Sequence, residues 1–411
     1  MVTRRRFIQG SAIATLLPIQ QKAIAMDEAM KARIAKIIRE YSDQGIHRTG
    51  SKVDDASADW FVAQIKAVGV EPTESSFLFD RVSVKKAELS FEGKTITGVP
   101  LFDCHFTDEK GVKGSMGRIG SDADIGVAMS LPFASSPSGK SIRAARLNNK
   151  HKAIIIVTDD RLPADGVATL NAEDYREPFG PPVLQLPNQD WPEIQKAMSA
   201  GAEGTAVVYA EYVESKARSI GARIRGEQVG LAPLVIMTPR SGWWRCASER
   251  GGGIACLLEM MRGIQEKGAI RDVIFTANTG HELGHTGLDQ YLEDNQTLIQ
   301  DASVWIHLGA NFAARYGPGV RLQFSDKKVR DVLGPFLDAN NVRPATETVV
   351  GERPLGEARN IHDHGGHYIS ILGQNRLFHH PADIWPDAVN LEDTTRWVNA
   401  FVQLGIKLSR G

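Results

Sequence analysis

The sequence predicts an α/β fold with a doubly wound, mostly parallel sheet, interrupted by a smaller inserted α/β domain. Two observations predict it. After residue 227, short apolar runs typical of strands alternate with longer stretches of helical periodicity. This alternation is typical of a parallel sheet covered by helices on both faces. Between residues 106 and 226, Gly, Ser, Asp and Pro become frequent and the apolar runs become short, which indicates a separate unit.

The chain begins with the features of an export signal. The segment from Thr3 to Gln9 contains paired arginines, an apolar run follows from Ala12 to Ile19, and Ala23-Ile24-Ala25 gives a small-x-small end. This order is typical of a cleavable signal peptide, and the arginines match the twin-arginine pattern. We therefore expect cleavage after Ala25, which leaves residues 1–25 outside the mature fold, and a periplasmic or secreted protein. A basic, disordered amino terminus is the alternative.

The composition limits the partners. The 48 Lys and Arg residues nearly balance the 49 Asp and Glu residues, so the sequence predicts no nucleic-acid partner. No later run of about 18 apolar residues follows the signal, and we expect no stable membrane insertion after cleavage. Three cysteines are too few for a disulfide framework, although one bridge plus a free thiol stays open. The oligomeric state is not predicted.

The first part of the mature chain predicts two helices and a hairpin. The helix over residues 27–43 places its apolar residues on one face, namely Met30, Ile34, Ile37, Ile38 and Tyr41. A second helix ends near Gly69, which is a C-cap signal. Strands are expected over 82–91 and 94–99, because Glu92-Gly93 is a turn signal between them.

Within residues 106–226, three further elements are expected. The run 153–157 indicates a buried strand, 191–200 a helix and 204–209 another strand. A set of long loops is the alternative, but structureless loops of this length are rare in compact domains.

The last part of the chain predicts the alternating elements of the main sheet. The expected strands and helices cover 234–237, 254–265, 273–277, 287–300, 303–308, 368–372 and 391–408. Ligands bind such sheets at the carboxyl ends of the strands. Eight of the eleven histidines lie after residue 280, several at or just after a predicted strand. Together with Glu249 and Glu282 they favour a metal or acid–base site, although a single histidine of this kind is usually structural.

The segment His281-Glu282-Leu283-Gly284-His285 fits the H-E-x-x-H pattern of zinc proteases. That pattern needs both histidines one turn apart on a stable helix. Here a predicted strand and turn precede it, and Gly284 and Gly287 weaken a helix. Tyr291 stands where the extended form of the motif requires a third histidine. We therefore do not expect a helical zinc-protease site.

The segment from Leu234 to Leu288 resembles the core of the co-catalytic zinc aminopeptidases. This family includes aminopeptidase Y-type enzymes, glutamate carboxypeptidase, glutaminyl cyclases and the non-enzymatic transferrin receptor. The stretch 246–253 is similar to the family's helix-opening motif, and 280–287 is similar to its Glu-Glu region. His307 ends the next strand, and 379–383 resembles the closing motif. The resemblance implies a metallopeptidase-like domain over 26–105 and 227–411, and residues 106–226 resemble a protease-associated domain.

The chain departs from the family pattern at several ligand positions. Pro239 and Ser241 replace the first His and its partner Asp, so one ligand is missing. His281 replaces the general base, and we expect it to be the catalytic residue. The resemblance implies a metal-ligand set of Glu249, Glu282, His307 and His379.

A charge count favours one metal. Two carboxylates and two neutral imidazoles balance a single divalent cation, and this mixed ligation suits zinc. We expect one zinc per chain, which activates a water if His307 stays outside the ligand shell, and His281 accepts the proton of that water. If all four residues bind, the site is structural. A site without metal is the third possibility.

Other residues near these positions are candidates for supporting roles. Arginines and aromatics can hold a substrate carboxylate or an apolar side chain, and the candidates are Arg240, Trp243, Arg250 and Arg359. An ordinary place on the rim is the alternative for them. Polar side chains around a metal orient its ligands, and the candidates are His285, His364, His380 and Asp383. The tract 362–367 serves this purpose or is simply a polar loop.

The sequence therefore predicts an exported metal-dependent hydrolase, aminopeptidase-like, that cleaves an amide bond of a peptide-like or aminoacyl substrate. The substituted ligand positions leave two alternatives. One is a non-catalytic binding protein on a peptidase scaffold, and the other is an aminoacyl transferase similar to glutaminyl cyclase.

Overall fold

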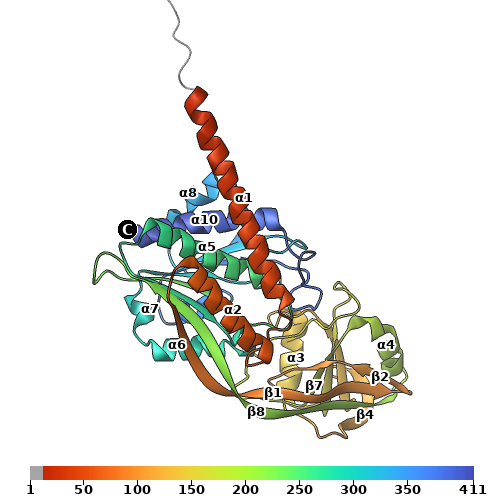
Figure 1. Ribbon diagram of the computed structural model, residues 1–411. Coiled ribbons are helices and arrows are strands. Elements are labelled where there is room, and N and C mark those ends of the chain that lie inside the picture. The colour runs from red at the N-terminus through yellow and green to blue at the C-terminus, as the bar shows by residue number, and fades with distance from the viewer. Residues whose placement is uncertain (1–12) are drawn as a thin grey trace, which may run out of the picture.

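The computed structural model describes the backbone of residues 13–411 and the side chains of residues 28–411 (Figure 1). Residues 1–12 of the predicted export signal lie outside the described residues. The remainder of that signal begins α1, a helix over Ile13–Asp43. Among the described residues, no helix combines the length and the apolar character needed to span a bilayer.

The main sheet confirms the predicted fold class. Four neighbouring strands run parallel in the order β14, β11, β9, β10, and they cover Tyr368–Gly373, Val304–Leu308, Leu234–Pro239 and Val273–Asn278. Antiparallel to β14 lies β12 (Val320–Phe324), with the short β13 (Thr346–Glu347) beyond it. The apolar runs of the central strands are buried on both faces, as expected for a parallel sheet.

Helices cover both faces of this sheet (Figure 1). Alternate residues of β9 separate the two faces, because successive strand side chains point to opposite sides. Leu234 and Ile236 belong to the core beneath α1, α2 (Lys52–Val68), α5 (Gly251–Lys267), α8 (Lys327–Ala339) and α10 (Leu391–Arg410). Val235 and Met237 belong to the core beneath α6 (Thr286–Asp294), α7 (Leu298–Asp301) and α9 (Ala358–Asp363).

Two long strands join this sheet to a second group of strands. β1 (Pro72–Phe91) and β8 (Glu203–Ile224) pair antiparallel along their length. The end of β8 pairs with β10, and its beginning pairs with β4 (Val112–Arg118). Beyond β4 the order is β5, β6, β7, β3, which cover Ile125–Ser130, Ala153–Thr158, Val183–Leu186 and Val99–Pro100. The sheet is therefore continuous from one part of the molecule to the other.

The second group of strands has its own helices and core. α3 (Pro137–Asn148), α4 (Trp191–Ser199) and a 3-10 turn over Asn188–Asp190 accompany its strands. Its largest apolar cluster draws on residues from Ala87 to Val208, so it includes the end of β1. The hairpin of β1 and β2 (Lys94–Thr97) turns at Glu92-Gly93 with Phe91 opposite Lys94. The assignment of 106–226 as a protease-associated-like domain stays a prediction.

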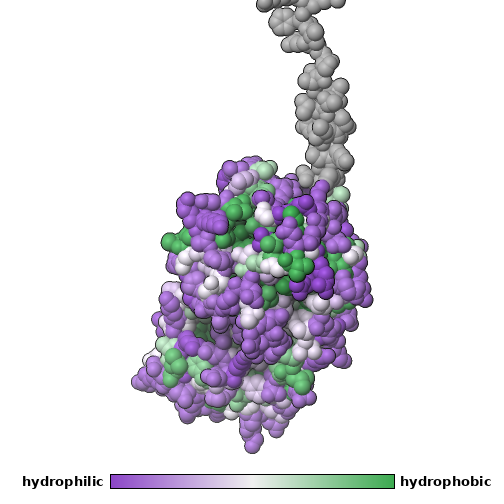
Figure 2. All heavy atoms as spheres, turned by 90° about the vertical axis from the view of Figure 1, so that its left-hand side faces the viewer, coloured by the Kyte–Doolittle hydropathy of each residue, from purple (hydrophilic) through white to green (hydrophobic). Residues whose placement is uncertain are grey.

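Most elements expected from the sequence are present, and one helix differs. The stretch expected to be helical over 287–300 is divided into α6 and α7, because the backbone leaves the helical region at Asn295 (φ −129°, ψ 54°). On the face shown in Figure 2, hydrophilic residues surround separate apolar patches.

Candidate functional site

The polar cluster lies where strands of the main sheet end. Ser241 follows β9, His281 follows β10, and His307 is the fourth of the five residues of β11. The turn after β10 needs left-handed backbone, with φ of 86° at Gly280 and 71° at Gly284. His281–Leu283 forms a single 3-10 turn rather than an α-helix, so the histidines of the H-E-x-x-H segment do not share a helix face. The rings of His281 and His285 instead stack at 4.8 Å.

Glu282 joins two loops through its carboxylate. One oxygen accepts hydrogen bonds from the backbone N–H and the hydroxyl of Thr49, at 2.7 and 2.8 Å. The other accepts from Ser241 Oγ at 2.6 Å. Burial raises the pKa of Glu282, and these hydrogen bonds oppose the rise. Both oxygens are therefore occupied by protein donors.

Arg250 places a permanent cation inside the cluster. Its side chain is fully buried. Nη2 lies 2.8 Å from Glu249 Oε1, and Nε donates to the carbonyl of Ser241 at 2.8 Å. Burial alone would raise the pKa of Glu249, but the charges of Arg250 and His379 hold it at about 2. Glu249 is therefore a carboxylate paired with a guanidinium.

His379 completes this side of the cluster. Its Nε2 lies 3.4 Å from Glu249 Oε1, and its Nδ1 lies 2.8 Å from the carbonyl oxygen of Thr169. A carbonyl can only accept, so Nδ1 carries a proton. Thr169 belongs to the connection between β6 and β7, which means that the second group of strands contributes to the site.

Glu357 is a buried carboxyl group that the sequence analysis missed. It lies 3.1 Å from Nδ1 of His281. Burial raises the pKa of Glu357 to about 8, with Arg250 opposing the rise. Burial also lowers the pKa of His281 well below 6.5, and the charge of Arg250 adds to the effect. Near neutral pH the pair is therefore uncharged, and the carboxyl group and the imidazole share one hydrogen bond.

The other predicted histidines divide into inner and outer positions. His307 contacts Ser370 Oγ at 2.9 Å through Nδ1, and burial lowers its pKa to about 3. Nδ1 of His285 lies 2.8 Å from Asn360 Oδ1. The Nδ1 of His380 accepts from the N–H of Ala382 at 3.1 Å. His364 is exposed and bonds to a backbone carbonyl, so the structure places it outside the cluster.

Asp383 holds the start of the helix-opening loop. Its two oxygens accept from the N–H and hydroxyl of Ser248, at 2.8 and 2.7 Å, and from the N–H of Glu249 at 2.9 Å. Burial raises the pKa of Asp383 to about 7, and these bonds oppose the rise. It thereby fixes the backbone from which the side chain of Glu249 extends.

The residues predicted to bind substrate lie in different places. Arg240 pairs with buried Asp54 at 2.9 Å and bonds to two backbone carbonyls, which is a structural arrangement. The indole of Trp243 donates to Asn171 Oδ1 at 2.9 Å. Arg359 pairs with Glu173 at 2.7 Å. Of the predicted set, Arg250 lies within the cluster, and Arg359 contacts its edge, with Nη2 3.4 Å from Nε2 of His285.

As they lie in this structure, the predicted ligands do not form a zinc site. Among the described residues, no group of three or more His, Cys, Asp or Glu side chains is placed to hold a metal ion. The carboxylate of Glu282 is occupied by Thr49 and Ser241, and that of Glu249 by Arg250. Zinc therefore stays a prediction from the sequence, and no chemical step is derived through it.

Several buried polar atoms of the cluster have no hydrogen-bond partner within the described residues. They are Oε2 of Glu249, Nη1 of Arg250, Nε2 of His307 and Oε2 of Glu357, whereas Oε1 of Glu249 contacts Nη2 of Arg250 and Nε2 of His379 as an ion pair. Buried polar atoms are nearly always hydrogen-bonded, so this concentration in one place indicates a functional site.

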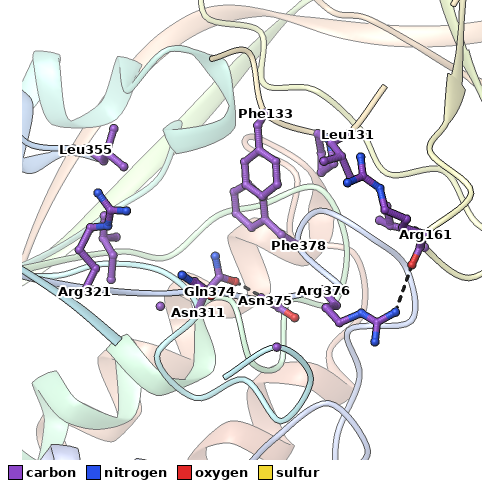
Figure 3. Close-up of a pocket in the computed structure, with 15 residues that line it drawn as sticks. Leu131, Phe133, Arg161, Asn311, Arg321, Leu355, Gln374, Asn375, Arg376 and Phe378 are labelled. Carbon is purple, nitrogen blue, oxygen red and sulfur yellow. Dashed lines mark hydrogen bonds between the residues drawn. The ribbon is translucent and has the colours of Figure 1, made fainter. Parts of the chain in front are cut away.

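A segment from the second group of strands covers the cluster. Between β6 and β7, the N–H of Ala172 donates to the carbonyl of Glu282 at 2.9 Å, and Asn171 and Glu173 hold Trp243 and Arg359. No residue of the inner cluster is more than 7% exposed. A cavity of about 590 Å³ lies beside the cluster, between the two parts of the molecule (Figure 3).

These features define an α/β fold with a buried His, Glu and Arg cluster at the strand ends. No family model and no curated protein sequence matches the chain.

Solved structures are similar over nearly all of it. A zinc aminopeptidase from Bacillus subtilis has a TM-score of 0.75 and 14% identity, covering 93% of this chain and 95% of that one. A peptidase M28 precursor from Shewanella amazonensis has a TM-score of 0.74 and 15% identity, with 94% and 96% covered. An aminopeptidase from Aneurinibacillus has a TM-score of 0.68 and 14% identity, covering 92% of this chain and 94% of that one. At these identities the likeness shows the fold.

Proposed function

We propose that this chain is a peptidase-like hydrolase that cleaves an amide bond of a small peptide-like or aminoacyl substrate. The observation that carries the proposal is the buried pair of His281 and Glu357 within the field of Arg250, whose Nη1 has no hydrogen-bond partner among the described residues. An acid–base pair and a fixed cation are two of the parts that acyl transfer requires. The fold, shared with solved aminopeptidases, supports the same class of reaction.

The pair can supply a general base. Once Glu357 loses its proton, its carboxylate accepts the N–H at Nδ1 of His281 and leaves Nε2 free to take a proton from water. The guanidinium of Arg250 would then stabilise the negative oxygen that forms on the attacked carbonyl carbon. Because burial raises the pKa of Glu357 to about 8, the basic form of the pair grows as the pH rises through that value.

Export belongs to the proposal as well. The paired arginines and the small-x-small end of residues 1–25 support a periplasmic or secreted protein. The balanced charge of the chain supports a small peptide-like substrate over nucleic acid.

The test is hydrolysis of amino-acid anilides, dipeptides and N-acyl amino acids by the purified chain. We expect His281→Asn and Glu357→Gln each to lower kcat/KM by about 10²- to 10⁴-fold, the usual contribution of general acid–base catalysis. We also expect the rise in wild-type rate near pH 8 to be absent in Glu357→Gln. The matched control is His364→Asn, an exposed histidine outside the cluster, which should keep the wild-type rate.

Chelation separates this proposal from a zinc-dependent reaction. We expect the rate to survive prolonged dialysis against a chelator, with no metal detected by elemental mass spectrometry. A rate that disappears and returns with zinc would contradict the metal-free chemistry and restore the predicted ligand set. A full rate in His281→Asn would overturn the assignment of the base.

One observation favours a second candidate, a non-catalytic binding protein on this fold. The carboxylates of Glu249 and Glu282, both predicted to bind metal, are already occupied by protein partners. A chain that binds peptide-like ligands but turns over none of the substrates above would support that candidate.

A further inference from the structure

The cavity beside the cluster is bounded by both parts of the molecule. Leu131 and Phe133 come from the segment after β5, Arg161 follows β6, and Arg321 lies on β12. The segment after β14 provides the floor, with Gln374, Asn375, Arg376 and Phe378 (Figure 3). A volume of about 590 Å³ is the size of a site for a small molecule.

The lining carries positive charge without an acidic residue. Three arginines line the cavity, and none of the other lining residues is Asp or Glu. Asp159 neutralises Arg161 through two hydrogen bonds, at 2.6 and 2.9 Å. Arg321 is half-buried and forms no hydrogen bond or ion pair with another described side chain, whereas exposed Arg376 donates at 3.5 Å to the carbonyl of Arg161. Arg321 and Arg376 are therefore both left without an acidic partner among the described residues, and Arg321 is the one whose side chain makes no hydrogen bond.

Apolar groups supply the rest of the surface. The rings of Phe133 and Phe378 stack with centroids 5.2 Å apart at 13°. In Figure 3 this pair stands between Arg321 and Leu355 on one side and Arg161 and Arg376 on the other. Phe133 is 40% exposed and Leu355 is 52% exposed, so two large apolar side chains face open space at this cavity. A ligand that covers them gains the free energy of removing apolar surface from water.

The walls of the cavity adjoin the polar cluster. The ring of Phe378 stacks on that of His379 at 3.7 Å. The N–H of Asn311 donates to the carbonyl of Glu249 at 3.0 Å. Leu355 stands two residues before Glu357. Gly356, between them, packs against His307 so closely that an added Cβ would lie 3.0 Å from the His307 ring. A ligand in the cavity is therefore one layer of residues away from the acid–base pair.

We infer that this cavity binds the substrate by its free carboxylate, and that the substrate is an N-acyl amino acid or short peptide with an apolar or aromatic side chain. Arg321 holds the carboxylate, and Phe133 and Phe378 contact the side chain. As a statement about substrate the inference rests on the proposed function, whereas the binding it describes does not depend on catalysis.

The test compares two probes that differ only in charge. N-acetyl-phenylalanine carries the carboxylate, and N-acetyl-phenylalaninamide carries a neutral amide in its place. Isothermal titration calorimetry with the wild-type chain should show the acid binding at least about tenfold more tightly than the amide, since a charge-assisted hydrogen bond to Arg is stronger than a neutral one.

Three variants locate the effect. Arg321→Gln should weaken binding of the acid by about tenfold or more and leave the affinity for the amide unchanged. Phe133→Ala should weaken both probes alike. The matched control is Arg343→Gln, which removes an exposed arginine outside the cavity that pairs with Asp338, and it should leave both affinities within about twofold of wild type.

The outcomes separate this inference from the proposed function. Equal binding of acid and amide, or an Arg321→Gln variant that binds the acid normally, would overturn the carboxylate site, whatever the catalytic assays show. Discrimination between the probes without hydrolysis of any substrate would confirm the site and contradict the hydrolase.

Discussion

Burial and the charge of Arg250 together set the charge states of the residues around it. Its guanidinium cannot lose its proton, so it keeps Glu249 ionised, and it adds to the burial that lowers the pKa of His281 and of His307. A divalent cation would act on these groups in the same direction. The guanidinium of Arg250 therefore balances the negative charge of Glu249, as a bound metal cation would. In this structure Glu249 is therefore paired with Arg250, and its role as a zinc ligand stays a prediction from the sequence.

The sequence indicated some of these residues and not others. Histidines clustered after strands were recognisable because parallel strands bring their ends together. Glu357 was not, because a single Glu at the start of a short helix is usually a solvated residue. Arg161, Arg321 and Arg376 come from three distant segments, and only the folded chain places them around one cavity. Arg240, close in sequence to the cluster, instead pairs with Asp54.

At the residue scale, His47 should make stability depend on pH. Burial lowers its pKa to about 3, while the unfolded chain binds the same proton near 6.5. Neutral His47 contributes fully to the stability of the fold above about pH 6.5, and this contribution is lost as the pH falls toward 3. When the pH falls from 7.5 to 5.5, the free energy of unfolding of the wild type should decrease by about 1.4 kcal/mol more than that of His47→Gln. Urea unfolding at the two pH values measures the difference, and equal losses would contradict it.

At the scale of elements, the start of α5 depends on close packing. A Cβ at Gly253 would lie 2.5 Å from Thr238 Oγ1 and 2.8 Å from the carbonyl oxygen of Leu308. These atoms belong to β9 and β11 and have little freedom to move. Glycine therefore lets the first turn of the helix rest on the sheet, which positions Glu249 and Arg250 just before it.

A pair of substitutions tests this packing. Gly253→Ala should destabilise the fold by about 1–3 kcal/mol, because the new methyl group meets the backbone. Gly405→Ala, in α10, should change stability by less than about 1 kcal/mol. There the nearest atom is the end of the flexible Met260 side chain, at 2.7 Å, and alanine favours helix. Denaturant unfolding compares them, and equal effects would show that backbone contact is not decisive.

Elements differed in how clearly the sequence predicted them. The strands β6 and β9 are buried along their whole length, so their apolar runs are unbroken and could be recognised as strands from the sequence. The full extent of β1 and β8 was not predicted, because long parts of both strands are half-exposed and mixed in composition. Their length comes from pairing with each other, and that pairing is not visible in local patterns.

At the scale of the whole molecule, the segment between β6 and β7 closes the cluster. It reaches from one part of the molecule to the other and is held there by hydrogen bonds to Glu282, His379 and Trp243. Because the cluster beneath it is almost wholly buried, a substrate reaches His281 only if part of the surrounding structure moves.

Asn171→Ala should loosen that segment. It leaves the buried indole N–H of Trp243 without its partner, a loss of about 1–3 kcal/mol. Hydrogen exchange followed by mass spectrometry should show faster exchange over residues 163–178, by about 5- to 100-fold. Gln195→Ala, on an exposed face of α4 in the same part of the chain, is the control and should exchange as wild type does. Unchanged exchange in Asn171→Ala would mean that other contacts hold the segment.

The long ribbon of β1 and β8 also has a thermodynamic consequence. Its strands of 20 and 22 residues extend for roughly 65–75 Å at about 3.3 Å per residue. β8 contributes hydrogen bonds and apolar side chains to both parts of the molecule, and β1 pairs with β8 along nearly its whole length. Neither part can lose its structure without freeing the edge of the other. The two cores, separate in their packing, are thus linked into one cooperative folding unit, and stability gained in either is shared by the cluster that lies between them.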